Sequence, residues 1–224
     1  RPDDHASHYN LGNFYGERRE YERAVACYQT ATKLQPNDIA PRVNASLVYN
    51  ALGRNEQAEK SLREALRIDP ASVPANLNLG LLLAEMGRSS EAESALRKAF
   101  DADKYNAVAA YNIGILRAQS NLAEAIEWVR KAKELRPGEP KYAYTLAFYL
   151  HENGNDDGAV RVLQKMLERK PASADPYALL GQIYEQSGRK NDAIAVYRQA
   201  TDNQSLPAPE RYRFAQRANT LENR

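Results

Sequence analysis

The chain has 224 residues, enough for one or two ordinary domains, and its 43% hydrophobic and 27% charged residues suit a folded soluble protein. Lysine and arginine number 31 against 29 acidic residues, so a net charge of +2 gives no reason to expect a nucleic-acid or polybasic membrane surface. One cysteine excludes an internal disulfide and a cysteine-based zinc site, and no apolar run approaches the roughly 18 residues of a membrane span. We therefore expect no metal, no cofactor, no nucleic-acid partner and no direct membrane insertion. The compartment stays open between cytoplasm and periplasm.

Small residues recur at a nearly constant spacing of 34 along most of the chain. One such series is Gly12, Ser46, Gly80, Gly114, Ala147 and Gly181, and a second is Ala24, Ala58, Ala92, Ala125, Ala159 and Ala193. Self-similarity at a fixed period is the signature of a repeat architecture. The predicted repeats are residues 5–38, 39–72, 73–106, 107–139, 140–173 and 174–207.

Each repeat is predicted to form two helices. In the first repeat, Leu11, Gly12 and Tyr15 make the core face of the first helix, and Ala24 and Tyr28 that of the second. A glycine inside a helix costs about 1 kcal/mol relative to alanine, so its periodic return indicates that a neighbouring helix approaches closely there. Prolines mark the end of most repeats, because proline cannot continue a helix. These prolines are Pro36, Pro70, Pro137 and Pro171.

The turn between the two helices differs among the repeats. Four repeats place a glycine there, namely Gly53, Gly87, Gly154 and Gly188. Arg19 stands in the corresponding place in the first repeat, and the fourth repeat has lost one residue between Gly114 and Ala125. In the fourth repeat we expect a tighter turn, with Asn121 as the candidate left-handed residue.

This pattern resembles the tetratricopeptide repeat family over residues 5–207. The resemblance depends on the 34-residue period, the Leu-Gly pair, alanine at positions 20 and 27 and proline at position 32, counted from the start of each repeat. Met166 at position 27 and Lys104 at position 32 depart from it. The resemblance implies an all-α fold, a right-handed solenoid (superhelix) of antiparallel helix pairs whose first helices line a concave side.

The two ends of the chain differ from the repeats. Pro2 lies 34 residues before Pro36, so residues 1–4 are interpreted as the remnant of a preceding repeat or as a linker. Residues 208–224 predict one amphipathic capping helix with Phe214 in the place of the repeated leucine.

No pattern in the sequence indicates an enzyme. The phosphate-binding, dinucleotide-binding, GxSxG and HExxH motifs are absent. His8 is expected to pack in the core, and His151 with Glu152 to lie on a solvated surface. Cys27 is interpreted as a structural or partly exposed thiol, because no base or cation is apparent beside it.

The first helices carry the candidate peptide-binding residues. Positions 4, 7, 8 and 11 of each repeat are expected to face the core, and positions 2, 5, 6, 9 and 12 to form the neighbouring stripe. Position 6 holds asparagine in four repeats, and an asparagine side chain offers a peptide backbone both a donor and an acceptor. Apolar and aromatic side chains occupy much of positions 5 and 9. The candidates are Tyr9, Asn10, Asn13, Asn44, Leu47, Asn78, Leu81, Tyr111, Asn112, Tyr144 and Phe148.

The resemblance implies a non-catalytic protein–protein interaction scaffold that binds a peptide or helix of a partner in the concave groove. One alternative is a non-catalytic targeting or regulatory arm of a larger enzyme, of the glycosyltransferase or multihaem cytochrome type. Another is a self-association module.

A clamp for a C-terminal carboxylate, of the kind found in some co-chaperone repeats, is not expected. Asn13 and Asn44 match the two asparagines of such a clamp. Tyr9, Pro74 and Asn78 stand where it needs cations, so the charge-assisted hydrogen bonds to a carboxylate would be missing.

Overall fold

The computed structural model describes residues 4–223, and these residues form thirteen α-helices and no strand, which confirms the all-α prediction. The helices are α1 (His5–Glu17), α2 (Tyr21–Leu34), α3 (Ala40–Ala51), α4 (Asn55–Ile68), α5 (Val73–Glu85), α6 (Ser89–Ala102), α7 (Ala107–Arg117), α8 (Leu122–Leu135), α9 (Pro140–Glu152), α10 (Asp156–Leu167), α11 (Asp175–Gln186), α12 (Lys190–Asp202) and α13 (Ala208–Glu222). None of these helices is long and apolar enough to cross a bilayer.

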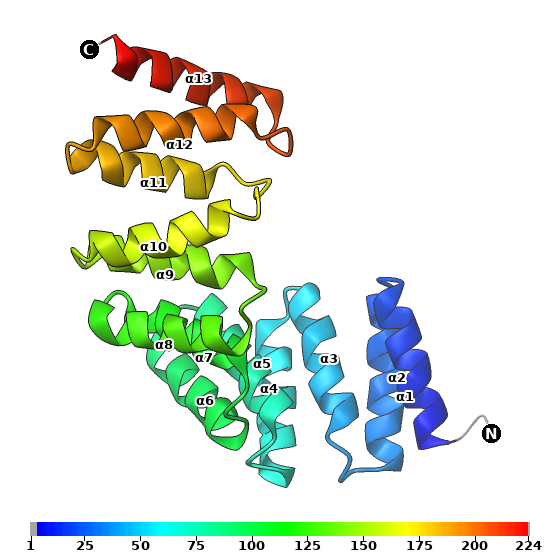
Figure 1. Ribbon diagram of the computed structural model, residues 1–224. Helices are drawn as coiled ribbons and strands as arrows, with labels where there is room; N and C mark the ends of the chain where they lie inside the picture. Colours follow the sequence, from blue (N-terminus) through cyan, green and yellow to red (C-terminus); the bar gives the residue numbers. More distant parts are fainter. Residues whose placement is uncertain (1–3, 224) are drawn as a thin grey trace. The chain divides into compact units, whose positions relative to one another are not determined.

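The chain divides into two compact halves between Leu116 and Arg117, here called the N-terminal half and the C-terminal half. In the N-terminal half, α1 packs on α2, α3 on α4 and α5 on α6, and α2 also contacts α3 and α4 contacts α5. In the C-terminal half, α9 pairs with α10 and α11 with α12, and α13 packs on α12 (Figure 1). Each half is therefore a stack of antiparallel helix pairs.

Small residues allow the two helices of a repeat to approach each other closely. A Cβ atom placed on Gly80 of α5 would lie 2.6 Å from the Leu96 Cγ and 3.1 Å from the Ala92 carbonyl oxygen of α6. Contacts that short would force α6 to move, so only glycine or a compensating shift fits this crossing. The close approach predicted from the periodic glycine is confirmed.

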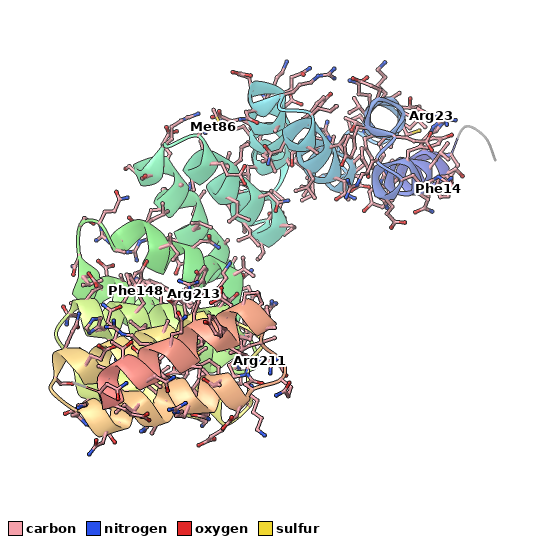
Figure 2. The ribbon with its side chains drawn as sticks, turned by 90° about the horizontal axis from the view of Figure 1, so that it is seen from above. Phe14, Arg23, Met86, Phe148, Arg211 and Arg213 are labelled. Carbon is pink, nitrogen blue, oxygen red and sulfur yellow. The ribbon has the colours of Figure 1, made fainter. Side chains whose placement is uncertain are left out.

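Leu11 departs from its predicted place in the core. Its equivalents Ala45, Leu79 and Ile113 are buried, but Leu11 is 40% exposed. Helices α3 and α5 each pack against the second helix of the preceding repeat, whereas no described helix precedes α1. Phe14 lies on α1 as well and is 48% exposed (Figure 2). The prediction for Leu11 is wrong because its burial depends on a neighbour and not on its own repeat.

The turns follow the sequence except in the fourth repeat. All four predicted turn glycines have positive φ angles, and Arg19 adopts the same left-handed backbone with φ 61°. The prediction for Asn121 is wrong, since its φ is −153° and its side chain caps α8 by accepting a hydrogen bond of 3.1 Å from the Glu124 backbone N–H. Helix α7 ends at Arg117, two positions earlier in its repeat than α5, which gives the chain room to turn with no left-handed residue at Asn121.

Helix α13 covers the apolar side of the last helix pair. The ring of Phe214 stacks on that of Tyr197, with ring centres 5.8 Å apart, and also contacts the ring of Tyr177. Ala218 and Leu221 are buried on the same face of α13. Phe214 therefore takes the core place that the repeated leucine predicts.

We expect Arg19→Gly to stabilise the protein. A left-handed backbone costs a residue with a Cβ about 1–2 kcal/mol, and glycine removes that cost while losing more chain entropy. The free energy of unfolding in urea should rise by about 0.5–1 kcal/mol. As the converse control, Gly53→Ala should lower it by about 1 kcal/mol, although no atom lies within 4 Å of the added methyl group. Equal stabilities for Arg19→Gly and the wild type would contradict this account of the turn.

Candidate functional site

Three of the candidate residues meet on the first helices of the N-terminal half. The Asn44 amide of α3 donates hydrogen bonds to the Asn13 Oδ1, 2.8 Å away, and to the Tyr9 hydroxyl, 3.1 Å away, both on α1. The Tyr28 hydroxyl of α2 donates to the same Asn13 oxygen at 2.8 Å. Both N–H groups of Asn44 are thus used to join α1 to α3, and sequence reasoning missed this structural role.

Burial raises the pKa of Tyr28 to about 12, with the neighbouring Tyr9 as a smaller cause. The Tyr28 hydroxyl therefore stays protonated and donates throughout the physiological pH range. The ring of Tyr28 lies over Gly12, where a Cβ atom would be 2.6 Å from its Cδ1. One side chain thus links the helix crossing in the core to the polar residues on the first helices.

The other candidates on α1, α3 and α5 remain more open. Asn10 is exposed, and Asn78 and Leu81 are half-buried. Leu47 is 53% exposed, although Val43 and Val48 on the same helix are buried. This surface therefore presents a bare apolar side chain beside amide groups.

The two candidates on α7 are less available than the sequence suggested. Tyr111 is only 8% exposed, so little of its ring can meet a ligand. Asn112 is half-buried, and its amide donates to the Val108 carbonyl of its own helix at 2.8 Å. Ile115, one turn further along α7, is 37% exposed.

In the C-terminal half, α9 carries the remaining two candidates. Tyr144 is half-buried, and Phe148 is 40% exposed (Figure 2). His151 on the same helix does not lie on a solvated surface as predicted, since its side chain is only 15% exposed. Its Nδ1 lies 2.6 Å from the Asp156 Oδ1 at the start of α10, a partner across the turn that the sequence pattern did not identify.

A cleft between α11 and α13 was not predicted from the sequence. It has a volume of about 810 Å³ and is lined by Gln182, Glu185, Arg213 and Arg217, among others. The Arg217 guanidinium donates two hydrogen bonds to the Glu185 carboxylate, at 2.6 and 3.0 Å, and the Tyr197 hydroxyl donates to it at 2.6 Å. The one sequence signal for this cleft is Tyr197, which occupies the same position of its repeat as Tyr28 does in the first repeat.

Cys27 and His8, which were considered for catalysis, lie on α2 and α1. Burial raises the pKa of the Cys27 thiol, which keeps it in its weakly nucleophilic protonated form. His8 is half-buried on α1 and is not among the buried residues, so its predicted place in the core is not confirmed. No group of three or more metal-ligating side chains occurs among residues 4–223.

Comparison with known families decides the identity of the repeats. Two models described as tetratricopeptide repeat match residues 5–38 and 77–140, one described as TPR repeat matches 47–87, and one described as Tetratricopeptide Repeats-Sensor matches 121–218. The chain belongs to the tetratricopeptide repeat family. Tetratricopeptide repeats stack into extended surfaces that bind partners, so this chain is an interaction scaffold in its general character.

Solved tetratricopeptide repeat structures share the fold of this chain. PilF of Pseudomonas aeruginosa is 20% identical with a TM-score of 0.74, over 95% of this chain and 97% of that protein. A MamA fragment from Desulfovibrio magneticus RS-1 is 23% identical with a TM-score of 0.66, over 75% and 97%. YrrB, described as a TPR protein with an unusual peptide-binding site, is 22% identical with a TM-score of 0.63, over 79% and 91%. No curated protein sequence matches this tetratricopeptide repeat protein.

We expect Asn44→Ala to destabilise the protein more than Asn10→Ala does. The first change removes two hydrogen bonds between α1 and α3, each with a net value of about 1 kcal/mol. The free energy of unfolding in urea should fall by about 1–2 kcal/mol. Asn10 occupies the same position of its repeat but is exposed, so its change should stay within about 0.5 kcal/mol. If the two variants unfold alike, the hydrogen bonds of Asn44 do not support the N-terminal half.

Proposed function

We propose that this protein is a scaffold that binds an extended peptide or an amphipathic helix of a partner protein along its first helices. The observation that carries the proposal is the repeated exposure of an apolar side chain at position 9. Leu47 and Ile115 in the N-terminal half and Phe148 in the C-terminal half occupy this position, and each is at least 37% exposed. Leaving a large apolar side chain in water forgoes about 1.5–3 kcal/mol of burial energy, so its recurrence supports a binding role.

Amide groups beside these apolar side chains support a peptide as the ligand. Asn10 is exposed and offers both a donor and an acceptor. The Asn44 oxygen accepts no hydrogen bond from the described residues and is therefore an available acceptor. Apolar anchors flanked by backbone-binding amides suit a peptide recognised through alternate side chains. The peptide-binding site of YrrB, a protein of the same fold, agrees with this class of ligand.

The proposal can be tested with peptides selected from a random displayed library against the immobilised protein. Leu47→Ala combined with Ile115→Ala removes two exposed anchors of the N-terminal half without opening the core. Affinity for the selected peptides, measured by calorimetry, should fall at least about tenfold, since a few anchors carry most of the energy of such interfaces.

The matched control is Leu34→Ala combined with Ile68→Ala. These residues lie at the ends of the second helices α2 and α4 and are 47% and 40% exposed. This control should bind the selected peptides as the wild type does. Equal affinities for the two double variants would place the peptide elsewhere and contradict the proposal.

Self-association is a second candidate function, favoured by one observation. Leu11 and Phe14 are both exposed on α1, and the Arg18 guanidinium lies over the Phe14 ring, 5.2 Å from its centre. Adjacent exposed apolar side chains on one helix face can pack against a second copy of the chain.

Light scattering at several protein concentrations tests this candidate. If α1 mediates dimer formation, the mass should rise with concentration for the wild type, and Phe14→Glu should keep the protein monomeric by placing a charge in the interface. Leu34→Glu adds the same charge on α2 and should still dimerise. A wild type that stays monomeric over the whole concentration range would eliminate self-association through α1.

A further inference from the structure

The C-terminal half contains an apolar pocket that none of the candidate residues lines. Helices α8 and α10 form its sides and the start of α9 its floor, and its volume is about 350 Å³. Pro137, Pro140, Ala143, Val162 and Met166 supply apolar surface to the walls. This volume lies near the lower end of the roughly 300–1,000 Å³ of ligand-binding pockets.

A small residue at position 4 of the fifth repeat gives this groove an apolar wall. The corresponding grooves of the second and third repeats are also open, with volumes of about 390 and 470 Å³, but they are lined mainly by polar and charged side chains. At position 4 of these two repeats, Arg42 reaches the Asp38 carbonyl at 3.0 Å and the Asn76 amide donates to two backbone carbonyls at 3.0 Å. Ala143 offers only a methyl group at the corresponding place, so the groove between α8 and α10 differs from those two in its apolar lining.

The end of α10 adds to the pocket. Met166 stands where other repeats have a small alanine, and α10 ends at Leu167 after 12 residues, whereas α4 and α6 have 14. The chain then turns through Lys170, whose φ of 47° places it in the left-handed region, before Pro171 closes the pocket. The sequence departure at Met166 thus coincides with a local change in the backbone.

Basic side chains surround the mouth of the pocket. Lys133 comes from α8, Lys165 from α10 and Arg169 from the turn after it, against the single carboxylate of Glu139. None of the three cations forms a salt bridge with any described residue, although most arginines of the C-terminal half do. An apolar cavity with unpaired cations on both sides is complementary to an apolar group flanked by carboxylates.

We propose that this pocket is a second docking site, which receives one apolar side chain of an acidic peptide segment from a partner protein. The apolar side chain fills the space above Ala143, and carboxylates on either side of it pair with Lys133, Lys165 and Arg169. The cations come from two helices and a turn, so they suit several carboxylates spread along a chain better than the single head group of a fatty acid. This site is independent of the proposed peptide surface on the first helices.

The experiment uses the full chain and a labelled short peptide with one central leucine flanked on both sides by aspartates. Fluorescence anisotropy should show saturable binding that weakens as salt screens the charges. A peptide with serine in place of leucine and a peptide with lysines in place of the aspartates should each bind at least about tenfold more weakly, because each lacks one half of the recognition. No binding of the acidic leucine peptide at low salt would overturn the proposal.

Two kinds of variant test whether the peptide binds in the pocket. Ala143→Leu fills the cavity, and Lys165→Glu with Arg169→Glu reverses its rim while leaving the core intact, so each should reduce affinity at least about tenfold. The matched control is Lys131→Glu with Arg161→Glu, which reverses two exposed cations outside the pocket on the same helices, α8 and α10. Circular dichroism verifies that each variant is folded. Equal losses in the two charge-reversal variants would show attraction by net charge alone and overturn the proposal, as would binding of decanoate but not of the peptide.

Discussion

The close approach of the two helices within a repeat is the constraint on which the rest of the structure depends. At Gly80 a single added carbon would strike both a side chain and the backbone of α6. This crossing fixes the rotation of the first helix about its own axis, so that one face is buried and the residues of positions 6 and 9 point away from the core. The surface of the first helices, which we propose to bind peptides, is therefore a geometric consequence of how the core is packed.

Two tyrosines on second helices, Tyr28 and Tyr197, connect the packed core to polar residues on the surface. The Tyr28 ring lies over Gly12, and its hydroxyl holds Asn13, which in turn accepts a hydrogen bond from Asn44 of the next repeat. In the same way the Tyr197 hydroxyl holds Glu185 on α11, which binds Arg217 of α13. In each half a core tyrosine positions a polar group that joins two helices, α1 to α3 in the N-terminal half and α11 to α13 in the C-terminal half.

The helix pairs and the glycine turns, which are set within a single repeat, could be predicted from the sequence, whereas the turn at Asn121 and the features set between repeats could not. The helix pairs, the turn glycines and the crossing at Gly80 follow from local spacing and backbone chemistry. The exposure of Leu11 depends on a helix outside its own repeat, and the partners of Asn44 lie 31 and 35 residues away. No periodicity specifies which of several polar side chains will be within hydrogen-bonding distance after packing, so the internal role of Asn44 could be seen only in the structure.

Because of the hydrogen bonds of Asn44, the asparagines at position 6 differ in the donors and acceptors that they can offer a ligand. Asn10 can both donate and accept, whereas Asn44 has spent its two N–H groups on Tyr9 and Asn13 and keeps only an oxygen. Along one edge of an extended peptide, N–H and C=O groups alternate. An N–H group opposite Asn44 gains a hydrogen bond, and a carbonyl there meets another oxygen. A peptide bound along α1 and α3, as we propose, would consequently align with an N–H group opposite Asn44, and this alignment would set which of its side chains face the helices.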